Sequence, residues 1–188
     1  MLVPLFGHLA AAAPEPYAPV PTPEFAERIN RNWRGVGIGY DNGLWGDQFA
    51  QGLKVDVPFG PVVGQFAGIR VRGLLFNHTE VGLSDFPAVY GQALLLGGGE
   101  LFGRGPVWGG IVRVYGGGGL WYGSTVIGGG EQHDGIAAGG HYGIEAILFE
   151  RGSFTFEIGG QSGIDGSDIG SGASVMAGIM FYLGGSSG

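Results

Sequence analysis

From about residue 34 onward, the chain is dominated by runs in which aliphatic residues alternate with glycine or with charged residues. In QFAGIRVRGLLF, at 65–76, Ile69 and Val71 alternate with Arg70 and Arg72. Successive side chains of a β-strand point to opposite faces, so this run predicts a strand with one aliphatic and one charged face. Charges at the other predicted strand centres also share the glycine-bearing face, and the whole set is Lys54, Asp56, Arg70, Arg72, Arg113, His141, Glu145 and Glu157.

Composition indicates which of the two faces points inward. Glycine supplies 43 of the 188 residues, about three times its ordinary share, whereas charged residues supply only 13%. A soluble barrel would turn the aliphatic face inward and leave a poor solvent coat of glycine with few charges. In a barrel surrounded by lipid the aliphatic face points outward, and the glycines make room for charges in a narrow interior. Buried charges persist when they are paired, and this set holds four cations and three carboxylates.

Eight alternating runs predict an all-β fold, an eight-stranded antiparallel up-and-down transmembrane β-barrel over residues 34–183. Lipid favours a closed barrel because unpaired backbone groups are costly there. PFGP, ELFGRGP and ERGS are predicted as tight turns, and longer loops are predicted around 77–88, 117–134 and 164–172. Aromatic residues near the strand ends indicate an interfacial girdle, namely Phe59, Phe102, Phe149, Phe154 and Phe181.

The termini differ in composition from the barrel region. Residues 1–13 resemble the later part of a signal segment without its basic beginning, and a disordered apolar tail is the alternative. Residues 14–33 are expected to form a Pro-rich linker followed by a short helix, and 184–188 a flexible tail. No apolar run is long enough for a transmembrane helix.

The last strand carries a more specific signal, MAGIMFYL. The chain resembles the small eight-stranded outer-membrane barrels of Gram-negative bacteria: the OmpA transmembrane domain, OmpX and the opacity-type proteins. Their terminal assembly signal has a polar residue, a glycine two positions later, and aromatics three and five positions after that glycine. Gly178 and Phe181 match this pattern, whereas Met176 replaces the polar residue and Leu183 an aromatic.

That resemblance implies a place in the bacterial outer membrane, in contact with membrane lipid and lipopolysaccharide. It also implies that the outer-membrane assembly machinery reads Gly178, Phe181 and Leu183. A monomer is expected. The net charge of −7 argues against binding to nucleic acid, which favours basic surfaces.

No pattern points to catalysis or to a cofactor. Residues four apart on a strand are separated by about 13 Å, so His141 and Glu145 form no base–orienter pair. HYG lacks the serine of the His-x-Ser pair in barrel lipid A deacylases, and EQHD at 131–134 matches no strong metal motif. We expect no enzyme, cofactor or metal.

The leading hypothesis is an outer-membrane protein with a structural or interaction role, whose interior is filled by the charged network and whose loops make the contacts. The alternatives are a narrow small-solute channel and, with less support, a lipid-modifying barrel enzyme or a soluble lipocalin-like carrier.

Overall fold

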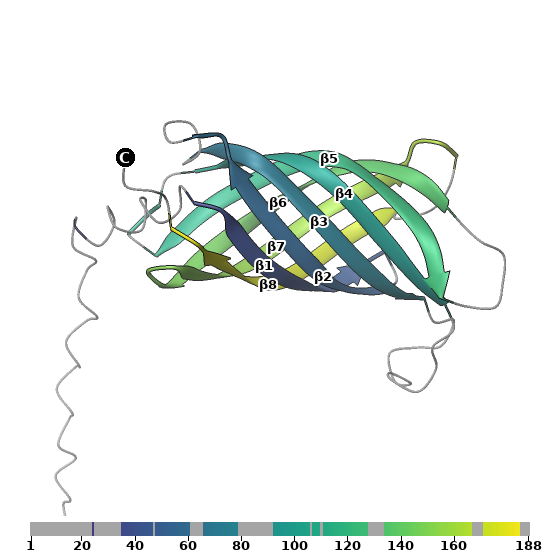
Figure 1. Ribbon diagram of the computed structural model, residues 1–188, viewed down its shortest axis with the longest axis horizontal. Coiled ribbons are helices and arrows are strands. Elements are labelled where there is room, and N and C mark those ends of the chain that lie inside the picture. The colour runs from purple at the N-terminus through teal and green to yellow at the C-terminus, as the bar shows by residue number, and fades with distance from the viewer. Residues whose placement is uncertain are drawn as a thin grey trace, which may run out of the picture.

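The computed structural model describes residues 24, 35–46, 48–60, 66–78, 92–105, 107–109, 111–127, 134–166 and 171–184. Eight antiparallel strands form a closed barrel in which each strand pairs with its sequence neighbours and β1 pairs with β8 (Figure 1). The strands are β1 (Gly37–Trp45), β2 (Gln48–Pro58), β3 (Ala67–His78), β4 (Gln92–Arg104), β5 (Val112–Ile127), β6 (Asp134–Phe149), β7 (Gly152–Gly163) and β8 (Gly172–Tyr182).

The predicted all-β, eight-stranded up-and-down barrel is therefore confirmed. The signal segment falls outside the described residues, as do 185–188 of the predicted tail. Of the predicted linker and helix only Glu24 is described, so these stay predictions. In the described part of the chain, no helix has the length and apolar character needed to cross a membrane.

Alternation along the strands separates two faces. In β3 the side chains of Arg70 and Arg72 are buried, whereas those of Ile69 and Val71 are 41% and 53% exposed. The same alternation of exposed aliphatic side chains with buried side chains is found in the other strands of the barrel. The exterior is consequently apolar, and the buried charged side chains all lie inside, the reverse of a soluble barrel.

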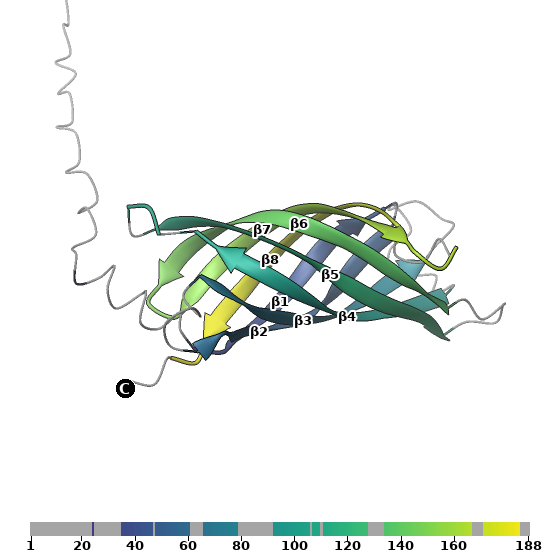
Figure 2. The same cartoon turned by 90° about the horizontal axis from the view of Figure 1, so that it is seen from above.

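The barrel has two distinct ends (Figures 1 and 2). The terminal end holds the start of β1, the end of β8 and the connections 59–66, 105–111 and 150–151. The loop end holds the connections 46–47, 79–91, 128–133 and 164–171. The longest connection, 79–91, leaves from the loop end, but the predicted division into short turns and long loops is only partly right. The loop-end connection 46–47 is a two-residue hairpin, whereas the terminal-end connection 59–66, predicted as a tight turn at PFGP, has eight residues.

Two local predictions were wrong for one reason. ELFGRGP was predicted as a turn, but Glu100 to Arg104 complete β4, and the connection begins at Gly105. The predicted loop 117–134 is mostly strand, because β5 runs to Ile127 through four consecutive glycines. Glycine runs indicate breaks when the sequence is considered alone. Here β4 and β6 pair with β5 on both sides and satisfy its backbone groups.

The predicted aromatic girdle needs one correction. Phe102 lies on the inner face of β4 and is only 3% exposed, because the strand continues past the expected turn. The other four aromatics are 42–50% exposed, namely Phe59, Phe149, Phe154 and Phe181.

Candidate functional site

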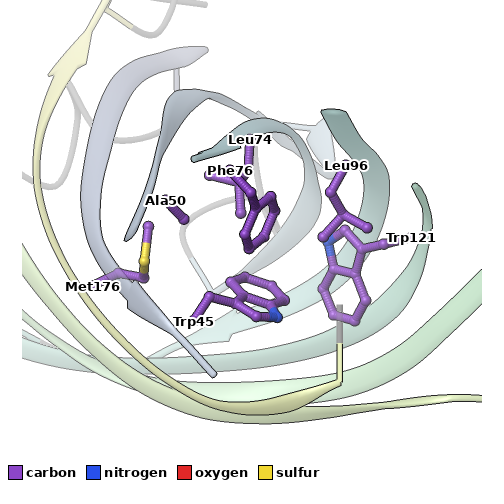
Figure 3. Close-up of a cluster of buried hydrophobic side chains, with 7 residues drawn as sticks. All are labelled: Trp45, Ala50, Leu74, Phe76, Leu96, Trp121 and Met176. Carbon is purple, nitrogen blue, oxygen red and sulfur yellow. The ribbon is translucent and has the colours of Figure 1, made fainter. Parts of the chain in front are cut away.

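The candidate site is the barrel interior, which has three layers along its length. Nearest the loop end, buried side chains of β1 to β5 and β8 form an apolar loop-end cluster (Figure 3). The Trp45 ring meets the rings of Phe76 and Trp121 edge-on, with centroids 5.7 and 6.0 Å apart. The cluster comprises Trp45, Ala50, Leu74, Phe76, Leu96, Trp121 and Met176, each at most 2% exposed.

Below the loop-end cluster lies a layer of charged side chains. All eight residues of the interior set chosen from the sequence are buried here, each at most 5% exposed. Among the described residues, five buried cations face five buried carboxylates, so the layer is balanced when its histidine is neutral. The cations are Lys54, Arg70, Arg72, Arg104 and Arg113, and the carboxylates are Asp41, Asp56, Glu100, Glu145 and Glu157.

Glu157 on β7 is the centre of this network. Arg70 donates to its Oε1 at 2.8 Å, and the ammonium of Lys54 donates to the same oxygen at 3.1 Å. Arg72 donates to Oε2, and the Tyr115 hydroxyl donates to Oε1 at 2.8 Å. Glu157 therefore links β7 across the lumen to β2, β3 and β5.

A second carboxylate, Asp56, holds two arginines. Arg70 Nε and Nη2 donate to its two oxygens at 2.6 and 3.0 Å, the paired geometry that guanidinium favours. Arg104 donates to Asp56 Oδ2 at 2.6 Å. The Arg70 guanidinium carbon also lies 5.2 Å from the ring centroids of Phe102 and Tyr115, which places it in cation–π range. Phe102 thus belongs to this interior layer.

Arg113 and Glu145 form a separate pair nearer the terminal end. They are direct cross-strand partners on β5 and β6, and Arg113 Nε lies 2.5 Å from Glu145 Oε2. The hydroxyls of Tyr182 and Ser153 donate to the other oxygen, Oε1. Beyond this pair a second apolar cluster reaches the terminal end, with Ile147, Met180 and Tyr182 buried and Val107 packed against them.

His141 lies between opposite charges. Its Nδ1 is 3.1 Å from Glu100 Oε2, and its Nε2 is 3.5 Å from Arg70 Nη1. His141 and Glu145 therefore have different partners, so the structure gives no sign of a catalytic pair. Of the EQHD segment only Asp134 is described, and it accepts a hydrogen bond from Tyr122 at 3.2 Å. In the described ranges no three His, Cys, Asp or Glu residues are placed to hold a metal ion.

Gly178, from the assembly signal, has a visible packing role in the interior. A Cβ at this position would lie 2.1 Å from Asp41 Oδ1 and 2.4 Å from the Tyr40 carbonyl oxygen. Asp41 in turn lies 2.6 Å from the Lys54 ammonium. Only glycine leaves room for this ion pair. The other two residues of the signal, Phe181 and Leu183, are 45% and 62% exposed.

The sequence analysis missed three members of the network: Asp41, Glu100 and Arg104. Asp41 follows Tyr40 on the opposite face of β1, so parity alone could have placed it inside. Glu100 and Arg104 were hidden because LLLGGG gives β4 no alternation from which to fix its phase. The register between β3 and β4 would have located Glu100, because it sets Arg70 opposite Glu100.

Comparison with solved structures supports the fold, and the sequence comparisons assign the chain to no family. Neither a protein-family model nor a curated protein sequence matches the chain. Two solved structures that share the fold are small eight-stranded outer-membrane barrels. The N-terminal β-barrel domain of Pseudomonas aeruginosa OprF is 14% identical with a TM-score of 0.60, covering 79% of this chain and 96% of that chain. Neisserial surface protein A is 11% identical with a TM-score of 0.54, covering 79% of this chain and 94% of that chain.

Proposed function

We propose that the chain is a non-conducting barrel of the bacterial outer membrane with a structural or interaction role. The apolar exterior supports the membrane location, because side chains such as Leu53, Val71 and Ile144 are 62%, 53% and 51% exposed. Such an exterior has a favourable environment in lipid and an unfavourable one in water. The shared fold with small outer-membrane barrels points the same way.

The closed interior is the observation that favours a scaffold over a channel. The loop-end cluster fills the lumen with side chains such as Trp45 and Trp121, and the ion-pair layer follows it. A permeating ion would have to displace packed aromatic rings and then pass fixed charges already engaged with one another. Eight strands enclose an interior that side chains can fill, which agrees with this arrangement.

The interaction surface is proposed at the loop end. By sequence, its connections hold six carboxylates and neither lysine nor arginine: Asp47, Glu80, Asp85, Glu131, Asp165 and Asp168. Lipopolysaccharide is the proposed partner, and divalent cations would bridge its phosphates to these carboxylates, since hard cations prefer oxygen ligands of both kinds. The exposed Phe181 and Leu183 at the terminal end are the proposed contact for the assembly machinery.

The test uses the purified full chain in detergent. Unboiled and boiled samples should migrate differently on electrophoresis, because the closed barrel resists unfolding by the gel detergent. In planar bilayers the folded protein should give no steady single-channel current, while a porin in the same bilayers shows that insertion and recording work. A monodisperse, folded sample in plain buffer would contradict the membrane location, and steady ohmic conductance would contradict the closed scaffold.

A further inference from the structure

The barrel is closed by the pairing of β1 with β8, which we call the closing seam. This ladder joins residues 37–45 to residues 174–182, whereas the other seven ladders join strands that are consecutive in the sequence. Consecutive strands are tethered by one connection, and the entropy lost on closing a loop grows with its length. The closing seam has no such tether. It is therefore the place where the barrel can open while every connected pair of strands stays together.

The side chain of Lys54 passes beneath this seam on the inside of the barrel. Lys54 belongs to β2 and is 0% exposed. Its ammonium donates to Thr155 Oγ1 and to Glu157 Oε1, each at 3.1 Å, and both residues belong to β7. In the closed barrel β1 and β8 lie between β2 and β7. One side chain therefore joins the two strands that flank the seam.

A glycine on each strand of the seam clears the path for this side chain. On β1, a Cβ at Gly39 would lie 3.0 Å from Lys54 Cε. On β8, a Cβ at Gly178 would lie 2.1 Å from Asp41 Oδ1 and 3.0 Å from Thr155 Oγ1. The Lys54 ammonium contacts both of these oxygens. The two glycines thus leave the space through which Lys54 crosses.

The ammonium is held from both sides of the seam. It has three N–H donors, and three acceptors surround it. Asp41 of β1 lies 2.6 Å away on the near side, while Thr155 and Glu157 of β7 bind it on the far side. When β1 separates from β8, the ammonium has to leave its partners on one of the two sides. Hydrogen bonds to charged groups are stronger than those between neutral groups, so this step is costly.

We propose that Lys54 is a strap that keeps the closing seam paired, so that removal of its ammonium makes the seam open more often while the rest of the wall stays closed. Glu157 keeps its hydrogen bonds from Arg70 and Arg72 when Lys54 is changed, because these arginines approach it from β3. The main loss therefore falls on the contacts that bridge the seam. The inference rests on the closure of the barrel and on these contacts, and it does not depend on the proposed partner or on conductance.

The experiment measures amide hydrogen exchange by mass spectrometry on the full chain in detergent micelles. Lys54→Met keeps most of the apolar stem and removes the donors, so the amides of residues 37–45 and 174–182 should exchange about tenfold faster or more. Arg113→Met is the matched control, because it also removes a buried cation but its partner Glu145 lies on β6, away from the seam. A barrel that opens only at the seam keeps that pair, so the seam amides of Arg113→Met should exchange at the wild-type rate. Equal acceleration in both variants would mean that these amides exchange only through complete unfolding, and it would overturn the strap, as would an unchanged rate in Lys54→Met.

A milder variant and a measurement on wild type keep the proposal testable if Lys54→Met does not fold. Thr155→Val replaces one acceptor by a methyl group of similar size and leaves no charge without a partner, so the seam amides should exchange about two- to tenfold faster. Lys54 is also the only lysine of the sequence, so an amine-reactive reagent reports on it directly within the barrel. In folded wild type it should be modified only in molecules whose seam amides have opened. Modification while those amides stay protected, or an unchanged exchange rate in Thr155→Val, would contradict the strap.

Discussion

Arg113 and Glu145 offer the cleanest test of how the interior charges are held. Glu145 is 2% exposed and receives hydrogen bonds from Arg113, Tyr182 and Ser153. Arg113→Met keeps most of the apolar stem and removes the guanidinium. The carboxylate then stays buried with only two hydroxyl donors.

The magnitude follows from what each single change leaves behind. Breaking a buried ion pair by removing one partner costs about 3–5 kcal/mol. Because Tyr182 and Ser153 still donate hydrogen bonds to Glu145, we expect Arg113→Met to lower the free energy of unfolding by an amount near the lower end of this range, about 3 kcal/mol. Glu145→Gln should cost a similar amount, since it leaves the Arg113 charge without its carboxylate. The double variant leaves neither charge unpaired, so its cost should fall about 2 kcal/mol short of the sum of the two single costs.

The assay is reversible urea unfolding in lipid vesicles, followed by tryptophan fluorescence. Arg151→Met in the exposed 150–151 turn is the control, and it should change the free energy of unfolding by no more than about 0.5 kcal/mol. If the double variant equals the sum of the singles within about 0.5 kcal/mol, the two groups are not coupled. The interior would then be hydrated and its charges screened, which would favour the channel hypothesis.

Two further predictions probe the outer face and the glycine-rich wall. Val71→Arg, at a 53%-exposed outward position, should destabilise the barrel in lipid by about 2–4 kcal/mol if it lies near the midplane. Val71→Ile should stay within about 0.5 kcal/mol, and equal costs in a vesicle unfolding titration would show the face assignment to be wrong. Gly119→Ala should cost about 1–3 kcal/mol, because its Cβ would lie 2.1 Å from the Gly99 carbonyl oxygen. Gly97→Ala meets no atom within 4 Å and should be neutral or stabilising by up to about 1 kcal/mol, so the reverse order in the same titration would refute this packing.

The sequence by itself determined the barrel and its two faces. Strand alternation is a local property with a period of two residues, so Ile69 and Val71 could be separated from Arg70 and Arg72 without knowledge of any partner. Eight such runs in a chain with few charges and many glycines then favoured a closed barrel with its charges inside. Parity also places Asp41 inside, because it follows the outward-facing Tyr40 in the first alternating run.

Local signals failed where glycine interrupts the alternation. The runs at 97–99 and 116–119 indicate breaks on their own, yet they belong to β4 and β5. Backbone hydrogen bonds to strands distant in sequence stabilise these segments, and nothing local reports on such partners. The same missing phase concealed Glu100 and Arg104 and placed Phe102 on the wrong face.

Only the tertiary structure decided which charges meet. Alternation puts both Glu145 and Glu157 on the same face as Arg113 without choosing between them, and the register between β5 and β6 sets Arg113 opposite Glu145. Glu157 instead reaches across the lumen to Arg70 and Arg72 on β3, although 85 or more residues separate them along the chain. Alternation along a strand determines which face a side chain occupies. Its neighbours inside the barrel depend instead on register, strand tilt and closure, which are properties of all eight strands together.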